Sequence, residues 1–442
     1  MNQTVSERKA RNVLAPWSKQ AAVNTPTFVR GEGSWLIDEA GKRYLDLSAG
    51  LVAVNMGHTH PKITAAIAEQ AQKVAYVPPS LVNDVRCELA DLLSELSPWD
   101  EGARTFFTTG GGEAIEDAIK MARMTSGRFK ILAAYRSFHG SAPGAGSLTG
   151  EDRRWANEPG LPGIARFFAP YTYSSPFFTD DPAEESARAL QHLEQVIMFE
   201  GPNNIAALFI EPLVGSNGVI SYPEGYLRGV REITERHGII LVFDEVMTGF
   251  GRLGDWFAAQ VFNVTPDMIV FAKGVASAYV PLGGVLVRES IAKHFDDNAL
   301  MCGHTYSGHP LTMAAGVANL KAMRDEGALQ KARELEPRLR SGLEALAEKH
   351  PVIGDVRGVG AMFGIEFVRN RDTREPLVPW YAGENTPVAQ LTAALREEGV
   401  YAFGRYNVML ITPPLILTED ELDFGLNALD AALTKVEGNW GL

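Results

Sequence analysis

The chain alternates between short unbroken apolar runs and longer segments in which apolar residues recur at helical spacing. The runs at 239–243 and 268–272 are rich in Ile, Val and Phe and show no alternation with polar residues. Such runs indicate strands buried on both faces of a parallel sheet. This alternation of strands with amphipathic helices predicts an α/β fold. Further strands are predicted at 104–108, 130–135, 206–210 and 285–287, and helices at 83–96 and 226–237.

After residue 320 the pattern of charged and apolar residues changes. A charged amphipathic helix is predicted at 321–349, then a glycine-spaced β element at 355–367. Helices around 388–397 and at 419–433 complete this part. Earlier in the chain, the turn at Asp38–Gly41 predicts a short β-hairpin. The segment 141–181, rich in Gly, Pro and aromatic residues, is predicted to be a long loop over a site entrance.

Each of the two central runs ends in one charged residue, Asp244 after the first and Lys273 after the second. Because ligands in open α/β sheets bind just beyond the carboxyl ends of the strands, these two residues are candidates for one site. A lysine amine forms Schiff bases with aldehydes. Pyridoxal phosphate (PLP) needs such a lysine and an acid that keeps its ring nitrogen protonated. The alternative is that Asp244 caps a loop and Lys273 is a partly buried lysine paired with a neighbour.

A turn of three glycines, at 110–112, separates a predicted strand from a helix that opens at Glu113. Backbone N–H groups at the start of a helix bind anions, and glycines allow a close approach. This turn is where the phosphate of PLP would bind. A tight strand-to-helix turn without a ligand is the alternative.

The residues around the charged pair follow a specific order. DEVMTGFGR at 244–252 precedes AKG at 272–274 and PLGG at 281–284. This order resembles the class III, or omega, aminotransferases of the fold-type I PLP-dependent enzymes, and is nearest to those that use omega-amino acids or amines with pyruvate. The resemblance implies a large domain with a mostly parallel seven-stranded sheet and a smaller α+β domain. The implied domains are 1–58, an N-terminal segment packing with the small domain; 59–318, the large PLP-binding domain; and 319–442, the C-terminal small domain.

The resemblance also assigns roles around the cofactor, with Lys273 and Asp244 as the catalytic residues. Phe138 would stack on the pyridine ring, where the family commonly has Tyr, and Val246 would pack against the opposite ring face. The family's Ser-Gly-Ser is replaced here by three glycines, so binding of the phosphate would depend more on backbone N–H groups than on side-chain hydroxyls. The cofactor-binding residues so implied are Gly111, Gly112, Phe138, His139, Glu211, Asp244, Val246, Lys273 and Thr305.

Thr305 would contact the phosphate of a cofactor bound to the neighbouring subunit, which implies a homodimer with shared sites, or a tetramer. For the substrate, the resemblance implies that Arg405 receives a carboxylate, with Phe403 competing for the aligned position. Val52 lies where some relatives have a bulky Trp, which suggests a roomier pocket. Trp17 is the third candidate for substrate binding.

The predicted activity is a PLP-dependent aminotransfer from an omega-amino acid or primary amine to a keto acid such as pyruvate, with ping-pong kinetics. Lys273 would hold PLP and then carry a proton, while Asp244 stabilises the ring cation. Met247 lies where relatives acting on ornithine or gamma-aminobutyrate carry Gln, which favours other omega-amino acids or amines. A PLP-dependent aminomutase or decarboxylase on the same fold and a noncatalytic PLP-binding protein are the alternatives.

The composition of the chain limits the kinds of partner and the cellular location that we expect. The 442-residue chain has a formal net charge of −13, which argues against nucleic acid or an anionic membrane. Its two cysteines, Cys87 and Cys302, indicate neither a disulfide framework nor a zinc site. No apolar run is long enough for a membrane helix, and the charged N-terminus is unlike a signal peptide. The predicted location is therefore the cytoplasm.

Two short motifs compete with this interpretation. Gly249, Gly251 and Gly254 spell the dinucleotide fingerprint G-x-G-x-x-G after a strand. That fingerprint requires an acidic residue at the next strand end, where this chain has a lysine. A His-x-His pair at 58–60 could bind a metal, but a loop entering a helix is the simpler account, and no metal site is predicted.

Overall fold

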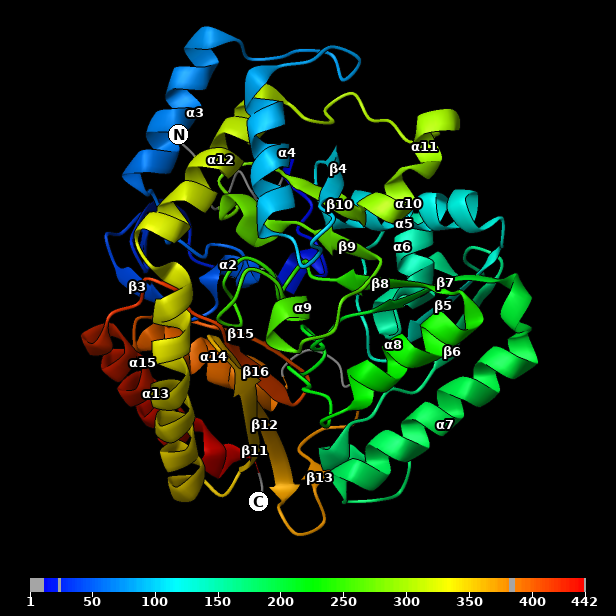
Figure 1. Cartoon of the computed structure of the whole chain (residues 1–442). Coiled ribbons are helices and arrows are strands. Elements are labelled where there is room, and N and C mark those ends of the chain that lie inside the picture. Colours follow the sequence, from blue (N-terminus) through cyan, green and yellow to red (C-terminus); the bar gives the residue numbers. More distant parts are fainter. Residues whose placement is uncertain (1–11, 23–24, 381–385, 441–442) are drawn as a thin grey trace.

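The computed structural model describes residues 12–22, 25–380 and 386–440, so the charged N-terminus at 1–11 lies outside the described residues. A seven-stranded sheet forms its centre (Figure 1). β10 is antiparallel to both of its neighbours, and the pairs from β9 to β6 are parallel. The predicted α/β class with a mostly parallel sheet is confirmed. In spatial order the strands are β4 (Ala103–Thr108), β10 (Gly283–Arg288), β9 (Met268–Phe271), β8 (Ile240–Asp244), β7 (Ile205–Ile210), β5 (Lys130–Ala134) and β6 (Ile164–Phe167).

The central strands bury both faces, which explains why their sequences do not alternate. In β8, Leu241 and Phe243 join one hydrophobic core, and Val242, which points to the other face, joins a second. Helices cover the two faces. The larger ones are α3 (Pro61–Lys73), α4 (Asp84–Leu96), α5 (Gly111–Ser126), α7 (Pro182–Glu200), α8 (Tyr226–His237) and α12 (Pro310–Asp325).

Local sequence sets the start of several of these helices. Asn83 caps α4 by accepting a hydrogen bond from the backbone N–H of Arg86, and Asp181 caps α7 in the same way. Proline occupies the first turn of α3, as its sequence predicts. α5 begins after Gly110 without a side-chain cap, so its first N–H groups have no intrahelical partner.

The N-terminal part forms a four-stranded sheet with a strand from the other end of the chain. β1 (Phe28–Glu32), β2 (Trp35–Asp38) and β3 (Arg43–Asp46) are antiparallel, which confirms the predicted hairpin. β14 (Val400–Tyr401) pairs with β3 in parallel. The predicted domain boundaries after residues 58 and 318 stay predictions; the second falls inside α12.

The C-terminal part packs helices against a second antiparallel sheet, at the lower left of Figure 1. The single helix predicted at 321–349 is wrong. Gly327 has a φ of +66° and separates α12 from α13 (Ala328–Lys349), because that conformation cannot continue a helix. The other elements of this part are β11 (Ile353–Val359), β12 (Met362–Asn370), β13 (Glu375–Pro376), α14 (Pro387–Glu397), β15 (Phe403–Arg405), β16 (Val408–Ile411), α15 (Glu419–Val436) and η6 (Glu437–Asn439).

The long loop predicted at 141–181 is also wrong. This segment contains the edge strand β6, the helix α6 (Pro143–Leu148) and the 3₁₀ turns η2 (Asp152–Asn157) and η3 (Thr172–Ser174). Each is too short to show a period in the sequence. The remaining short elements are η1 (Gln20–Ala22), α2 (Ala49–Val52), η4 (Pro202–Asn204), α9 (Ala258–Val261), η5 (Lys273–Ala276), α10 (Glu289–Ala292) and α11 (His294–Asp297). Within the described ranges, no helix has the length and apolar character needed to cross a membrane.

Candidate active site

A pocket of about 630 Å³ lies beyond the carboxyl ends of β8 and β9. Asp244 is the last residue of β8, and Lys273 follows β9 by two positions. The fold thus brings the two charged strand ends to one cavity, as expected for neighbouring parallel strands. Nine of the site residues predicted from the sequence line this pocket: Trp17, Gly111, Gly112, Phe138, His139, Glu211, Asp244, Val246 and Lys273. Met247, at the position where some relatives carry Gln, lines it too.

Three other candidates lie outside the lining of this pocket. Val52 is buried at the end of α2. Thr305 is exposed, and its carbonyl accepts a hydrogen bond from the hydroxyl of Tyr76. Arg405 is bound to carboxylates near the pocket, as described below.

Lys273 is the first residue of η5 and has a φ of +47°. Burial lowers the pKa of its amine to about 8, because a charged ammonium loses its hydration there. The charges of Asp244 and Glu211 raise this pKa, and those of Arg153 and Arg252 lower it further. A large fraction of the amine is therefore neutral near pH 8, as a nucleophile or base requires.

Asp244 is held from two sides. Its Oδ2 lies 2.7 Å from Nδ1 of His139, and its Oδ1 accepts a hydrogen bond of 3.1 Å from the backbone N–H of Val246. Burial lowers the pKa of His139, but the hydrogen bond and charge of Asp244 outweigh this effect and the net pKa is raised. The imidazole therefore orients the carboxylate, with its other nitrogen, Nε2, buried without a partner among the described residues.

Glu211 follows β7 and is buried in the same pocket. Its carboxylate accepts hydrogen bonds of 2.8 Å from the backbone N–H groups of Phe138 and Gly215. Burial nevertheless raises the pKa of Glu211 to about 7, with a contribution from the nearby charge of Asp244. It ties together the loops that follow β5 and β7.

The start of α5 fits a phosphate group. The first N–H groups of this helix lie at the pocket, and no side chain in the described part of the protein caps them. A Cβ on Gly111 would lie 2.8 Å from Cγ2 of Val246, so glycine is required for the close approach. Together with a buried lysine and an acid in the same pocket, this cradle fits PLP.

Sequence reasoning missed Arg153. Its guanidinium lies 3.6 Å from the centre of the Phe138 ring, a cation–π contact, and Trp17 packs edge-on against the same ring at 6.3 Å. Arg153 donates to Oγ of Ser216 at 2.9 Å and to Oε1 of Glu151 at 2.5 Å. Nothing in the sequence around Arg153 signals this position, since it lies in a short 3₁₀ turn with no period.

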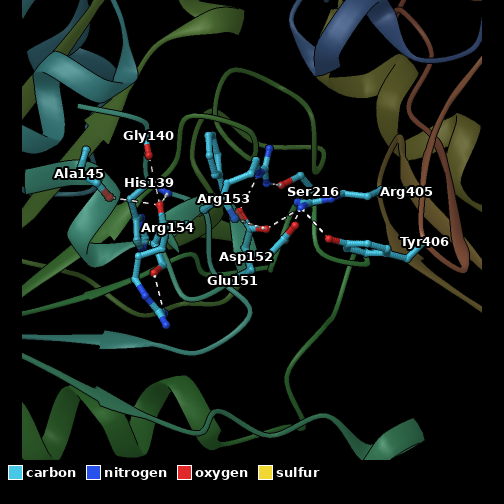
Figure 2. A network of polar contacts seen from close by, with 12 residues as sticks. His139, Gly140, Ala145, Glu151, Asp152, Arg153, Arg154, Ser216, Arg405 and Tyr406 are labelled. Carbon is cyan, nitrogen blue, oxygen red and sulfur yellow. Dashed lines mark hydrogen bonds and ion pairs between the residues drawn. The ribbon is translucent and has the colours of Figure 1, made fainter. Parts of the chain in front are cut away.

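Arg153 and Arg405 both bind Glu151, and Arg405 also binds Asp152 (Figure 2). Nη2 of Arg405 lies 2.7 Å from Glu151 Oε2 and 2.5 Å from Asp152 Oδ1, and the guanidinium also packs on the ring of Tyr406. Burial raises the pKa of Glu151. Two arginines and two carboxylates therefore form one ion-pair cluster, which reaches the pocket at Phe138 through Arg153.

The pocket wall formed by residues 278–282 was not assigned to the site either, although PLGG at 281–284 belongs to the family motif. This wall comes directly after the Lys273 turn in the sequence. Its position after the lysine is the signal that could have identified it. Tyr279 anchors this wall, because its hydroxyl donates a hydrogen bond of 2.8 Å to the carbonyl of Gly57.

The two competing motifs have other roles. The segment 249–254 enters no long helix, and Gly251 has a φ of +84°, a left-handed conformation that favours glycine. The dinucleotide interpretation is therefore not supported. His58 pairs with Asp46 at 2.9 Å and His60 with Glu326 at 3.1 Å, so the two imidazoles serve different carboxylates.

Fold and pocket together define a PLP-dependent enzyme: a lysine and an acid at neighbouring strand ends, facing an anion cradle at a helix start. Residues 17–433 match the family described as aminotransferase class-III, and the chain belongs to this family. The resemblance noted in the sequence is thereby confirmed, and the protein is an aminotransferase that uses PLP and a keto acid acceptor.

Individual relatives agree over nearly the whole chain. A taurine–pyruvate aminotransferase of Bilophila wadsworthia is 33% identical, with 94% of this chain and 93% of the relative covered. The solved structure of a taurine:2-oxoglutarate aminotransferase from Bifidobacterium kashiwanohense, in complex with PLP and glutamate, superposes with a TM-score of 0.95 at 40% identity, over 99% of this chain and 100% of the other. An (S)-enantioselective omega-transaminase from Thermomicrobium roseum gives 0.93 at 37% identity, with 99% and 100% coverage.

Proposed function

We propose that this aminotransferase takes its amino group from an omega-amino acid or a primary amine and passes it to pyruvate in a ping-pong reaction. The observation that carries the proposal is the meeting of Lys273 and Asp244 in one pocket beside the uncapped start of α5. The named activities of the taurine and omega-transaminase relatives support this donor class.

The chain's own residues would divide the work as follows. The N–H groups at Gly111 and Gly112 bind the phosphate, and Phe138 and Val246 enclose the ring. Asp244, oriented by His139, keeps the ring nitrogen protonated. PLP supplies an electron sink that makes a carbon–hydrogen bond of the donor acidic.

Lys273 is the group that moves protons in this proposal. With a pKa of about 8, its amine is neutral often enough to accept a proton from the donor carbon, and the ammonium so formed would donate that proton again. Its burial excludes bulk water from that transfer. The lowered pKa supports a general base role, because an ordinary lysine would be almost fully charged at neutral pH.

Arg405 would bind the carboxylate of the keto acid. A guanidinium suits a bidentate contact with a carboxylate, and Arg405 already binds two carboxylates of the chain itself, Glu151 and Asp152. A donor without a carboxylate would leave these internal pairs intact. This exchange would let one pocket accept both an anionic keto acid and an amine donor that carries no anionic group.

A homodimer is part of the proposal. Large apolar side chains are exposed around Thr305, and Arg86 ties this region together by donating to the carbonyls of Leu81 and Gly308. Exposed apolar groups gathered in this way favour association with a second copy. Thr305 would then reach the cofactor phosphate of that copy. The exposed side chains are Tyr76, Leu81, Val82, Met301 and Tyr306.

A cytoplasmic location remains a prediction from the sequence.

The test is a matrix of donors (taurine, beta-alanine, short and aromatic primary amines) against pyruvate and 2-oxoglutarate, with Lys273→Ala as the control. Turnover should require both a donor and a keto acid. An aminomutase or decarboxylase would consume its substrate without a keto acid, and a noncatalytic protein would turn over none of the pairs. Turnover with alpha-amino acid donors alone, or an active Lys273→Ala variant, would refute the proposal.

A further inference from the structure

The turn that carries Lys273 has an unusual backbone. Lys273, Ser277 and Ala278 have φ values of +47°, +46° and +58°. Side chains other than glycine rarely adopt this left-handed conformation, so three such residues within six positions require support from outside the turn.

That support comes from Asn319, in the middle of α12. Its Nδ2 donates hydrogen bonds of 2.9 Å to the carbonyls of Gly274 and Val275, and its Oδ1 accepts one of 2.6 Å from Oγ of Ser277. Asn319 is fully buried. Both amide hydrogens and the amide oxygen are thus used on three of the four residues that follow Lys273.

The contact continues to a third part of the chain. Oγ of Ser277 accepts a hydrogen bond of 3.1 Å from the backbone N–H of Met56. A Cβ on Gly274 would lie 2.6 Å from Nδ2 of Asn55, so a second asparagine packs directly against the turn. Asn319 itself lies outside the lining of the pocket and can act on the reaction only through the turn.

We propose that Asn319 is a positioning residue for the aminotransfer reaction: it fixes the turn at Lys273 so that the lysine amine lies where it can attack the aldehyde of PLP. The alternative role is to fill space in the core, which a residue of the same size without hydrogen-bonding groups would do equally well. This inference rests on the role of Lys273 in the proposed function.

The experiment compares two ligands on the cofactor-free protein. PLP is captured by the lysine, whereas pyridoxamine phosphate has no aldehyde and binds only through the phosphate and ring contacts. In Asn319→Leu, PLP capture should be about tenfold slower or more, because a displacement of about 1 Å of a reacting group can cost about 100-fold. The dissociation constant of pyridoxamine phosphate should change less than about threefold. Ser277→Ala, a smaller change, should slow capture in the same direction.

Leu320→Ala is the matched control, since Leu320 is the next residue of α12 and is also buried. It should lower the melting temperature and leave PLP capture unchanged. Equal losses for both ligands in Asn319→Leu, or unchanged capture in Asn319→Leu and Ser277→Ala, would overturn the inference. These measurements need no amine donor, so they can be interpreted whether or not the wild-type protein is an active transaminase. Absence of transaminase activity would refute the proposed function, but it would not change the comparison of PLP with pyridoxamine phosphate.

Discussion

The lowered pKa of Lys273 predicts how fast the cofactor-free protein captures PLP. Only the neutral amine attacks an aldehyde. With a pKa of about 8, about one tenth of the amine is neutral at pH 7; an ordinary lysine of pKa 10.5 would be neutral in about 3 molecules in 10,000. Lys273 should therefore offer about 300 times more neutral amine at this pH.

Rapid mixing of cofactor-free protein with PLP, followed by the absorbance of the lysine-bound cofactor, measures this rate. The rate should rise with pH and level off above about pH 8, because a lysine whose pKa is lowered is already neutral there. A soluble lysine derivative, mixed with PLP over the same pH series, corrects for titration of PLP itself. Its rate should still be rising at about pH 9.5.

Two variants should move the midpoint of the pH–rate profile for PLP capture in opposite directions. Asp244 raises the pKa of Lys273 and Arg153 lowers it. Asp244→Asn should therefore shift the midpoint to lower pH, and Arg153→Gln to higher pH. A rate that climbs steadily through pH 9.5 in the wild type, or shifts of the same sign in both variants, would refute the electrostatic reasoning.

Three further predictions test the other parts of the site. Gly111→Val should raise the dissociation constant of PLP at least about tenfold, measured by equilibrium dialysis, because the added side chain meets Val246 and blocks the phosphate cradle; unchanged affinity would contradict it. Arg405→Leu should raise the KM for pyruvate about 10- to 100-fold, because loss of a charged hydrogen bond costs about 1.5–3 kcal/mol. The KM for an amine without a carboxylate should not change. Equal changes in the two KM values would exclude a specific anion site. The raised pKa of His139 stabilises the fold fully below about pH 6.5, and this stability is lost as the pH rises through the folded pKa. The melting temperatures of wild type and His139→Gln should therefore differ most at low pH and converge at high pH, and a gap that widens with pH would refute the charged pairing with Asp244.

The sequence reveals the centre of this fold because burial on both faces of a strand leaves an unbroken apolar run. Asp244 and Lys273 interrupt such runs, so their place at the strand ends could be predicted, and the glycines before Glu113 marked the start of α5. The order of these elements was enough for the family resemblance.

Other parts of the site leave no pattern in the sequence. Arg153 reaches Phe138 from a 3₁₀ turn. Asn319 is the one polar residue among the buried positions of α12, and its partners are two backbone carbonyls and the hydroxyl of Ser277. β6 has only four residues, too few to show a period. Contacts that depend on where loops return in space cannot be predicted from spacing along the chain.

The pairing of β3 with β14 has a consequence for biosynthesis. β3 ends at Asp46 and its parallel partner begins at Val400, while the amine of Lys42 binds the carbonyls of Arg396 and Glu397. At roughly 5–20 residues per second, a ribosome needs roughly 20–70 s to make the intervening part of the chain. During that time the edge of β3 stays unpaired, so the emerging polypeptide should depend on chaperones until the segment around Val400 leaves the exit tunnel.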